Sequence, residues 1–489
     1  MSSFYVQNFG CRATQADGAA IEEQFREQGL TRADDPRNAR FVVLNTCAVT
    51  ASAEQDARAA VRRIRRENSD CEVIVTGCYA QRVPDEVASL PGVSAVIGNS
   101  HKNILARIAL HGPSGNDRAR PDFVSLSSLT YEKKSFGPSV FVSDIFAHTE
   151  LIAAPVFDSA NQRTRPNLKV QDGCNNRCSF CIIPSVRGAS RSLKLHEILR
   201  EVNQLIQSGY REVVISGINL GRWGREFQDQ AMWGGRPRSP KFEDLVRAIL
   251  DQTSLEKLRI SSVEPMDWSD SLIRLMAETP RIAKHAHVPM QSGSDTVLRR
   301  MHRKYRPWHY REKVEKIRAA MPTAAIGADV MVGFPGETDR EFEDTRRMIE
   351  DLPFTYLHVF TFSARPGTPA ASMSNQVPAR QARERNRILR ELAAKKKRAF
   401  MQQFLGQQVE AISLNVICET ADGSWTEALT DNYLKMRIIG RLEANQWLKA
   451  DVTDVAEDIM IGSQIGGFAS NLMGSEFARE GRTGNYSAA

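Results

Sequence analysis

Short apolar runs alternate with amphipathic stretches over roughly the first hundred residues of the chain. The strand-like runs cover 4–10, 41–46, 72–77 and 93–98. Helical periodicity occurs around 15–28 and 52–67, between those runs. Strands that alternate with helices in this way are typical of a parallel sheet covered by helices. The pattern therefore predicts an α/β N-terminal domain with a doubly wound parallel sheet over residues 1–111.

A longer alternation of the same kind begins near residue 168. The strand-like runs read LKVQDG, EVVISG, KLRISS, HAHVPM, AAIGADVMVGF and TYLHVFTF. Helical stretches separate them near 194–208, 241–253, 269–278, 308–320 and 338–351. Six βα units make an incomplete version of the eight-unit parallel barrel. We therefore expect a partial (βα)6 barrel over residues 166–404.

Three further segments have other patterns. Residues 112–165 contain runs rich in Gly, Pro, Ser, Asn and Arg, which predict an interdomain linker with some extended pieces. Short alternating runs over 405–470 predict a small antiparallel β barrel, a common nucleic-acid platform. Residues 471–489 are expected to form a loosely ordered tail.

Composition indicates the cellular compartment in which the protein is expected. The 489 residues are 42% hydrophobic and 25% charged, as in ordinary globular proteins. No apolar run approaches the ~20 residues that a membrane span needs, and the chain does not open with a signal-peptide pattern. We expect a cytoplasmic protein with no membrane partner. Eight cysteines in such a chain favour metal or redox chemistry over a disulfide framework.

Charge is compatible with a nucleic-acid partner without requiring one. The net charge is +7, and nine basic residues stand against two acidic ones between positions 377 and 404. A second basic cluster lies on one predicted helix and comprises Arg58, Arg62, Arg63, Arg65 and Arg66. Each cluster is either a solvated helix face or a surface for phosphates.

Three cysteines come directly after three of the N-terminal strands, at Cys11, Cys47 and Cys78. Ligands of doubly wound sheets collect beyond the carboxyl ends of the strands, so these side chains should meet at one edge. They make a candidate three-cysteine site. Cys71 opens a predicted strand and would lie at the opposite edge, and Cys418 lies in the small β domain. We expect both to be structural thiols.

A second triplet follows the first barrel strand in QDGCNNRCSFCIIP, residues 171–184. Cys174, Cys178 and Cys181 have C-x3-C-x2-C spacing, with no fourth cysteine nearby. A structural zinc site closes with four ligands. Three cysteines can instead hold an iron–sulfur cluster and leave one iron open to a non-protein ligand. The loop would lie on the face of the barrel that carries active sites. A zinc-binding or accidental triplet is the alternative.

Other candidate groups lie just beyond the predicted barrel strands or within them. Four polar residues could contact a cofactor or substrate or be satisfied surface groups: Asn219, Glu264, Gln291 and Ser292. Gly333 and Gly336 in GFPGE either let the backbone approach a ligand or form a turn. His285 and His287 share one face of a strand and could pair as ligands, although hydrogen-bonded barrel histidines are the commoner role.

The triplet with its aromatic Phe180 resembles the radical S-adenosylmethionine signature. NFGCRATQADG, VLNTCAVTASAE and IVTGCYAQ resemble the N-terminal domain of the methylthiotransferases. The resemblance continues through GCNNRCSFCIIPSVRGASRS, ISGINLGRWG, SSVEPMDW, HVPMQSGSDTVLRRM, DVMVGFPGET and FSARPGTPA. It covers nearly the whole chain apart from the linker and the extreme C-terminus. The small β barrel is similar in texture to the family's tRNA-binding TRAM domain.

The resemblance implies two 4Fe-4S clusters and S-adenosylmethionine as cofactors. Cys174, Cys178 and Cys181 would hold the cluster that cleaves S-adenosylmethionine to a 5′-deoxyadenosyl radical, and the N-terminal cysteines would hold an auxiliary cluster. The residues expected to contact the cofactor are Phe180, Gly217, Asn219, Glu264, Gln291, Ser292, Gly333 and Gly336. Both clusters must then face one cavity, with the N-terminal sheet packed over the barrel mouth.

The motifs also indicate a branch of the family. The branch acting on isopentenyladenosine usually has an arginine shortly after NTC, where this chain has Thr50. NTCAVT, VTGCYAQ, IGNSHK and ISGINLGRWG resemble the branch acting on N6-threonylcarbamoyladenosine at tRNA position 37. The implied reaction transfers a methylthio group to C2 of that base, splayed out of the anticodon loop. The implied partners are the tRNA anticodon stem-loop, an electron donor and a sulfur source.

Alternative functions remain open, and two positions differ from the usual family pattern. The alternatives are the isopentenyladenosine branch, the branch that modifies a ribosomal-protein aspartate, and a non-catalytic zinc-stabilised RNA-binding protein. Thr14 stands where the family usually has asparagine, and Ser185 where it often has tyrosine. Neither change removes a cluster ligand, but Thr14 alters the hydrogen bonding expected near Cys11.

Overall fold

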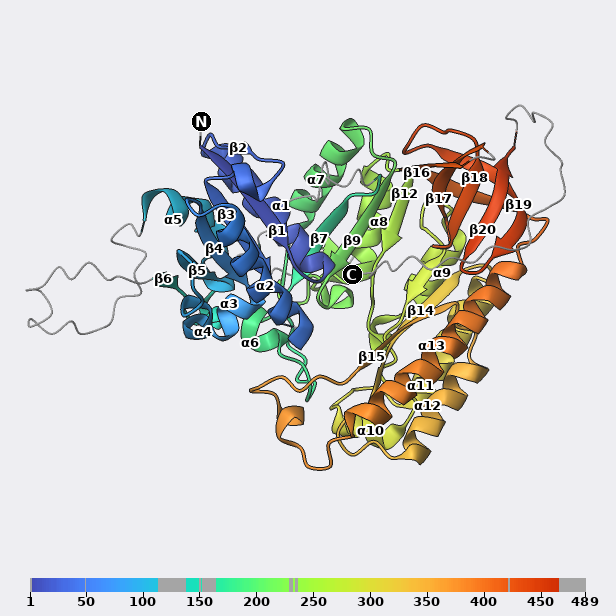
Figure 1. The fold of residues 1–489 in the computed structure, drawn as a ribbon. Coiled ribbons are helices and arrows are strands. Elements are labelled where there is room, and N and C mark those ends of the chain that lie inside the picture. The colour runs from blue at the N-terminus through green and yellow to red at the C-terminus, as the bar shows by residue number, and fades with distance from the viewer. Residues whose placement is uncertain are drawn as a thin grey trace, which may run out of the picture.

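A computed structural model shows three domains in chain order, with the central barrel domain between the other two (Figure 1). It describes residues 2–48, 50–112, 138–148, 151, 164–227, 232–233, 236–420 and 423–465. None of the described helices combines the length and the apolar character that a bilayer-spanning segment requires.

The N-terminal domain is a six-stranded parallel sheet in the order β2-β1-β3-β4-β5-β6. The strands are β1 Ser3–Asn8, β2 Thr31–Arg32, β3 Phe41–Thr46, β4 Glu72–Gly77, β5 Ala95–Gly98 and β6 Ser139–Phe141. β3 is buried along its whole length, as expected for a central parallel strand covered on both faces.

Helices cover both faces of this sheet. The chain adds β2 on one side of β1 and β3 on the other, so the direction of growth reverses between β1 and β3. Right-handed crossovers then place α1 (Arg12–Glu27) and α5 (Leu105–His111) on one face and α2 (Ala51–Glu67) on the other. The predicted doubly wound α/β sheet is confirmed, and its reversal point is where ligands collect in such folds.

β6 lies within the segment interpreted as a linker. It pairs in parallel with β5 and is followed by the short helix Ile145–Ala147, so it is one of the extended pieces expected there. Most of the remaining linker, residues 113–137 and 152–163, lies outside the described part of the chain.

The central domain contains six parallel barrel strands. They are β7 Asn167–Asp172, β9 Glu212–Gly217, β12 Lys257–Ile260, β13 His285–His287, β14 Ala325–Val332 and β15 Tyr356–Thr361. They form two hydrogen-bonded sheets, β12-β9-β7 with the short antiparallel β8 (Arg191–Ser192), and β13-β14-β15. Isolated parallel bridges between Leu258 and Ile282 and between Ser262 and His287 join them. The predicted partial (βα)6 barrel is confirmed.

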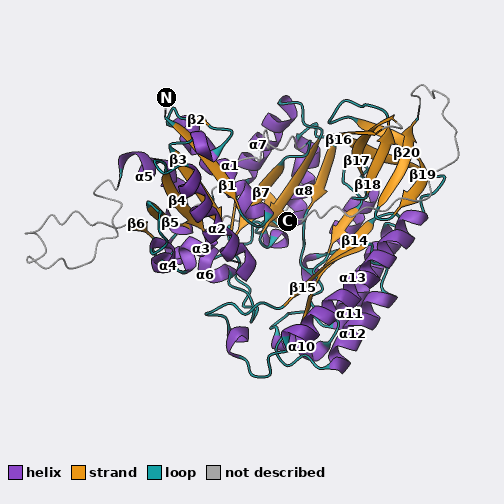
Figure 2. Ribbon diagram, viewed as in Figure 1, coloured by secondary structure: helices purple, strands orange, loops and turns teal. Residues whose placement is uncertain are grey.

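The barrel helices lie on the outside of the strands (Figure 2). They are α7 Leu195–Gln207, α8 Phe242–Gln252, α9 Asp270–Glu278, α10 Asp295–Arg300, α11 Pro307–Ala320, α12 Asp339–Asp351 and α13 Ala379–Gln402. Local sequence fixes several of their starts. Thr338 and Glu341 form a reciprocal capping box at α12, and the Ser269 hydroxyl accepts from the backbone N–H of Leu272 at α9. One continuous apolar core fills the space between these helices and the strands.

The C-terminal domain is a closed five-stranded β barrel in the order β16-β17-β18-β20-β19. Its strands are β16 Gln408–Thr420, β17 Gly423–Thr430, β18 Lys435–Ile439, β19 Trp447–Ala456 and β20 Ile459–Gln464. The prediction of a purely antiparallel barrel is wrong in one pair, because β18 and β20 are parallel. An odd number of strands cannot alternate in direction around a closed ring, so one neighbouring pair must be parallel. The predicted tail at 471–489 lies outside the described residues.

The three domains make direct contact. On α1 of the N-terminal domain, Asp17 ion-pairs with Lys169 of β7 and accepts a hydrogen bond of 2.9 Å from Arg187. The turn between β17 and β18 of the C-terminal barrel contacts the central domain. Arg259 Nη1 donates to the carbonyl of Asp431 at 3.0 Å, and Asn432 Nδ2 donates to the carbonyl of Thr323 at 2.9 Å. The N-terminal and C-terminal domains are therefore both fixed to the central barrel.

Candidate active site

The three N-terminal cysteines lie on loops that leave neighbouring parallel strands. Cys11 precedes α1, Cys47 follows β3, and Cys78 opens the short helix α3 (Cys78–Arg82) after β4. Two glycines allow these loops to converge. A Cβ added to Gly10 would lie 2.5 Å from the Cβ of Cys47, and one added to Gly77 would lie 2.3 Å from the carbonyl oxygen of Thr46. The structure thus brings the three loops together at one sheet edge.

Polar groups reach two of these sulfur atoms. The Thr14 hydroxyl lies 3.5 Å from Cys11 Sγ, and Asn99 Nδ2 lies 3.6 Å from Cys78 Sγ. Asn45 fixes the backbone here by donating to the carbonyl of Thr14 at 2.7 Å. Hydrogen bonds to ligand atoms tune a metal centre, so threonine at position 14 keeps a polar group beside Cys11.

The barrel triplet lies on a loop held by backbone and side-chain hydrogen bonds. The amide of Cys174 donates to the carbonyl of Gly188 at 3.1 Å, and that of Cys181 to the carbonyl of Cys178 at 3.1 Å. Two side chains from distant parts of the barrel donate to sulfur. Asn219 Nδ2 lies 3.5 Å from Cys174 Sγ, and Arg303 Nη1 lies 3.4 Å from Cys178 Sγ.

Both triplets fit an iron–sulfur cluster by donor type. Each offers three thiols with N–H or O–H groups near sulfur, which is the environment of cysteine-ligated clusters. Burial raises the pKa of Cys181 to about 12 and also raises that of Cys174. Cluster iron would supply the positive charge that keeps such partly buried thiols deprotonated.

A largely apolar cavity of about 400 Å³ lies beside the barrel triplet. Its wall includes Thr50 from the N-terminal domain, Cys181 from the triplet loop and Gln291 from the barrel. Around them lie Phe180, Ile182, Ile183, Met331, Phe360, Thr361, Phe362, Ser363 and Arg365. Residues of two domains therefore enclose this space.

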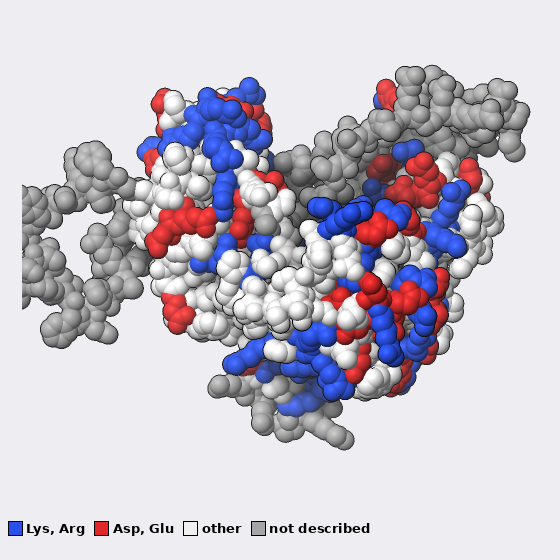
Figure 3. Space-filling view, turned by 60° about the horizontal axis from the view of Figure 1, so that its bottom comes forward, with Lys and Arg blue, Asp and Glu red and all other residues white. Residues whose placement is uncertain are grey.

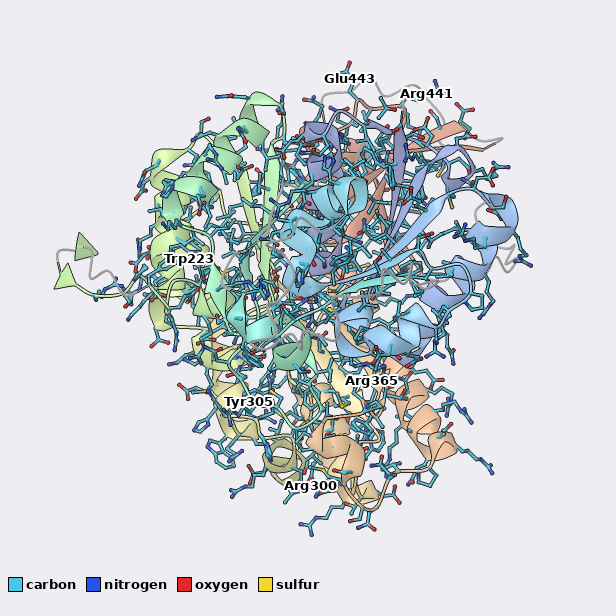
Figure 4. All side chains as sticks on the ribbon, turned by 90° about the vertical axis from the view of Figure 1, so that its left-hand side faces the viewer. Trp223, Arg300, Tyr305, Arg365, Arg441 and Glu443 are labelled. Atoms are coloured by element: carbon cyan, nitrogen blue, oxygen red, sulfur yellow. The ribbon has the colours of Figure 1, made fainter. Side chains whose placement is uncertain are left out.

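Direct packing links the two triplets. Cys78 shares a buried apolar cluster with Ala48, Ile182 and Val186, and Ile182 is the neighbour of Cys181. Arg365, labelled near the junction in Figure 4, donates to Glu54 Oε1 on α2 at 3.2 Å. Both three-cysteine sites therefore border the junction between the N-terminal sheet and the barrel, as expected from the sequence.

Three of the predicted cofactor contacts have groups available for a ligand. Asn219 Oδ1 and Gln291 Oε1 are buried and have no hydrogen-bond partner among the described residues. Gln291 has φ 62°, a strained backbone for a residue other than glycine, which is a common feature of functional sites. Phe180 lies in the cavity wall. Burial raises the pKa of Glu264, although its ion pair with Arg303 opposes this shift.

The other predicted contacts have packing roles in the structure. Ser292 Oγ lies 3.1 Å from Thr345 Oγ1 inside the barrel wall. A Cβ on Gly333 would lie 2.7 Å from that of Ala382 on α13, and Gly336 donates to the carbonyl of Asn375 at 2.7 Å. Gly217 lies against Gln171. Cofactor contact at these four positions stays a prediction.

Two functional groups near the triplets were missed by sequence reasoning. Arg303 follows α10 in a general run of basic residues, and nothing in its spacing marks a contact with Cys178. Gln171 lies within β7 and accepts from the amide of Asn219 at 2.7 Å. Each contacts a residue more than forty positions away in the sequence, and local sequence patterns do not reveal such contacts.

The remaining cysteines and histidines behave largely as expected. Cys71 is buried at the start of β4, with its thiol donating to the carbonyl of Asn68 at 3.2 Å. Cys418 lies in β16, far along the chain from both triplets, but it is only partly buried, unlike the buried thiol that was expected. His285 is hydrogen-bonded to the Tyr356 hydroxyl at 2.6 Å. His287 lies beside Asp329 and His358 rather than pairing with His285 as a ligand.

Comparisons with known proteins agree with this arrangement. The radical SAM superfamily matches residues 168–349, and the family described as uncharacterized protein family UPF0004 matches residues 3–98. The fold resembles that of TsrM, a radical S-adenosylmethionine methyltransferase of Kitasatospora setae, with a TM-score of 0.53 and 14% identity over 76% of this chain and 74% of that one. This likeness supports the fold alone.

Relatives with high coverage extend over all three domains. A Bacillus subtilis protein named threonylcarbamoyladenosine tRNA methylthiotransferase is 33% identical over 92% of this chain and 94% of its own. Its Aquifex aeolicus namesake is 33% identical over 91% and 98%. A Thermobifida fusca tRNA-2-methylthio-N(6)-dimethylallyladenosine synthase is 33% identical over 84% and 77%. The chain therefore belongs to the radical S-adenosylmethionine tRNA methylthiotransferase family, whose chemistry uses S-adenosylmethionine and a 4Fe-4S cluster.

Proposed function

We propose that this protein transfers a methylthio group to C2 of N6-threonylcarbamoyladenosine at position 37 of tRNA. The observation that carries this proposal is the placement of two three-cysteine sites at one interdomain junction, next to an apolar cavity of about 400 Å³. A reaction that combines sulfur held at one cluster with a radical produced at another needs both in reach of the same base.

Each cysteine site has a separate role. Cys174, Cys178 and Cys181 would hold the cluster that binds S-adenosylmethionine, and Cys11, Cys47 and Cys78 would hold an auxiliary cluster that carries the sulfur to be transferred. The chemistry supplied by the bound cofactors is methyl transfer to sulfur and radical activation of C2. The protein supplies position and exclusion of water.

The chain's own side chains place and enclose the reactants. Asn219 Oδ1 and Gln291 Oε1 are buried acceptors that can take hydrogen bonds from an amino group or a ribose hydroxyl. Arg303 holds Cys178 and Glu264 in place at the same time. Phe180 and Phe360 line the cavity with apolar surface, which keeps water away from a reactive radical.

The branch of the family is supported by the position of Thr50. The isopentenyladenosine branch usually has arginine here, and Thr50 lies in the cavity wall with Cys181 and Gln291. The Thr50 hydroxyl also caps α2 by accepting from the amide of Ala53 at 3.2 Å. A residue that distinguishes the branches thus borders the space where the base would enter.

Exposed basic groups are available for tRNA phosphates. α13 keeps Arg380, Arg383, Arg390 and Arg398 exposed, whereas Arg385 is buried and ion-paired with Glu337 and Asp339. Figure 3 shows a further group of Lys and Arg side chains on the N-terminal domain at upper left, and mixed charges over the helices of the barrel at lower right. These surfaces would bind phosphates of the anticodon stem-loop, together with the small β barrel as the TRAM-like domain.

Two more partners complete the reaction. An electron donor must reduce the barrel cluster, and a sulfur source must restore the auxiliary cluster after each transfer. We place this activity in the cytoplasm, where tRNA is modified.

Nucleoside analysis of tRNA tests the proposed function. The reconstituted enzyme, S-adenosylmethionine and a reductant would be incubated with anticodon stem-loops that carry either N6-threonylcarbamoyladenosine or isopentenyladenosine at position 37. We expect the 2-methylthio product from the first RNA only. Product from the isopentenyl RNA alone would move the protein to the other branch, and product from neither RNA would contradict the proposal.

A further inference from the structure

A group of polar side chains, His287, Asp329 and His358, lies on the barrel strands next to the apolar cavity, and we call it the polar triad. Asp329 and His358 precede the cavity residues Met331 and Phe360 by two positions on β14 and β15, so they share the same inward face. His287 of β13 completes the group, and one side-chain ligand atom from each of the three lies within 4.8 Å of the others. His358 is exposed, so the group is accessible to a ligand.

Arg12 of the N-terminal domain, directly after Cys11, lies beside this polar triad. Its Nη2 donates to the Tyr433 hydroxyl at 3.2 Å. Tyr433 lies in the turn between β17 and β18, and its ring centroid is 4.5 Å from that of His285 and 5.9 Å from that of Tyr356. All three domains therefore contribute to one polar surface.

Arg12 is a cation without a carboxylate partner in the described part of the chain. The neighbouring carboxylates have other partners: Glu212 pairs with Arg259 at 2.5 Å and with Arg165 at 3.7 Å. Asp329 lies 3.4 Å from His287. The guanidinium of Arg12 therefore leaves an unbalanced positive charge beside a cluster ligand.

Positive side chains surround the polar triad. Burial lowers the pKa of His358, and His287 and Arg12 lower it further, whereas Asp329 opposes this shift. Burial likewise lowers the pKa of His285 well below its usual value, with Arg259, His287 and Arg12 acting in the same direction. A divalent cation at this triad would be attracted by the Asp329 carboxylate and repelled by Arg12.

The substituent of the proposed substrate matches these groups. N6-threonylcarbamoyladenosine carries a carboxylate and a hydroxyl, whereas an isopentenyl group carries neither. Consecutive Cα atoms lie about 3.8 Å apart, so an arginine next to Cys11 can reach the substituent of a base whose C2 faces the auxiliary cluster. Arginine binds carboxylates through strong, charge-assisted hydrogen bonds.

We propose that Arg12 and Tyr433 form a subsite for the carboxylate of the threonylcarbamoyl group, and that His287, Asp329 and His358 bind its remaining polar atoms. This inference rests on the proposed function and adds the residues that select the substrate. Arg12 is then a specificity residue rather than part of the radical chemistry.

Binding and turnover by Arg12 variants test this subsite. Dissociation constants and kcat and KM would be measured for wild type, Arg12→Gln and Arg12→Lys on two stem-loops, one with threonylcarbamoyladenosine and one with plain adenosine at position 37. Loss of a charge-assisted hydrogen bond should weaken binding of the first RNA by about 10- to 100-fold in Arg12→Gln. Binding of the second RNA should change by less than about twofold, and Arg12→Lys should recover part of the loss. Tyr433→Phe should show a smaller effect in the same direction.

The matched control is Arg274→Gln, which removes one exposed arginine from α9 and should affect neither RNA. Equal weakening of both RNAs by Arg12→Gln, or loss of iron from that variant, would overturn the subsite. So would stoichiometric Zn²⁺ binding that is lost in His358→Gln, because it would assign the polar triad to a cation. The binding arm distinguishes the two proposals: failure of turnover in wild type, with Arg12-dependent discrimination in binding, would contradict the function but not the subsite.

Discussion

The two three-cysteine sites are built in different ways. The barrel triplet, Cys174 to Cys181, lies within one loop after β7, whereas the N-terminal triplet, Cys11 to Cys78, is assembled from loops after three separate strands. The N-terminal site exists only when β1, β3 and β4 are in register. The barrel site has its ligands locally but takes hydrogen bonds from the distant Asn219 and Arg303. One site depends on strand pairing, and the other on remote side chains.

The largest expected difference between the sites is in their chemistry. Cys47→Ala and Cys178→Ala should each reduce methylthiolation by at least about 10³-fold, because groups that act as a unit fail together. Only Cys178→Ala should also abolish cleavage of S-adenosylmethionine to 5′-deoxyadenosine, since we assign that step to the cluster proposed at the barrel triplet. Chromatographic assay of both products separates the roles. Normal cofactor cleavage in Cys178→Ala would contradict the assignment.

Asp17 connects the two sites and should affect both. It lies on α1 after Cys11 and pairs with Lys102, Lys169 and Arg187, all of them buried. Asp17→Asn would leave these cations without their shared carboxylate and should reduce the free energy of unfolding by about 3–5 kcal/mol. Denaturant titration measures this loss. Asp35→Asn, which breaks an exposed pair with Arg37, should leave stability nearly unchanged and serves as the control.

The carboxylate of Asp17 also makes the folding stability depend on pH. Burial alone would raise the pKa of Asp17, but Arg187, Lys102 and Lys169 lower it to well below its usual range. A depressed folded-state pKa contributes stability above the unfolded value of about 3.9 and loses it as pH falls through the folded value. Wild type should therefore lose stability in acid more steeply than Asp17→Asn. Parallel acid titrations of the two proteins would contradict this role.

Gly77 should affect the N-terminal site alone. It has φ 96°, and a Cβ there would lie 2.3 Å from the Thr46 carbonyl oxygen. Gly77→Ala should cost about 1–3 kcal/mol in backbone strain, with the steric contact in addition, and should displace Cys78. Gly29→Ala is the matched control, because Gly29 has φ 79° but nothing within 4 Å of its added Cβ. Iron content should fall in the first variant and not in the second.

Arg303 should affect the barrel site alone, with the smallest effect. Arg303→Gln removes a donor to Cys178 and the partner of partly buried Glu264, and changes around metal ligands typically cost about 10- to 100-fold in activity. The midpoint potential of the barrel cluster should shift while that of the auxiliary cluster stays constant. Arg300→Gln is the control: Arg300, at the bottom of Figure 4, pairs with Glu341 instead. An unchanged potential would show that Arg303 only supports the fold.

Much of the fold could be predicted because it depends on local patterns. Buried runs such as Phe41–Thr46 mark central parallel strands, and the cysteines after them identify the sheet edge. The small β barrel was predicted correctly, but the parallel pairing of β18 with β20 was not, since it depends on strand count rather than on any run of residues. β6 joins the sheet across a long segment with no strong pattern of its own.

The candidate site, too, could be predicted only where its residues lie close together in the sequence. C-x3-C-x2-C spacing locates the barrel triplet because all three ligands belong to one loop. The contact of Arg12 with Tyr433 joins residues at opposite ends of the chain, and sequence periodicity contains no information about it. The role of a glycine could not be predicted from sequence alone. Gly333 avoids a clash with Ala382, and a glycine needed for packing looks the same in sequence as one that binds a ligand.

The most direct test of two separate clusters is a count of iron and acid-labile sulfide after anaerobic reconstitution. Wild type would be measured beside Cys174/Cys178/Cys181→Ala and Cys11/Cys47/Cys78→Ala. Two 4Fe-4S clusters predict about eight irons in wild type and about four in each triple variant. About four irons in wild type that vanish when the barrel triplet is removed would contradict the auxiliary cluster, and with it the proposed transfer of sulfur from the N-terminal domain.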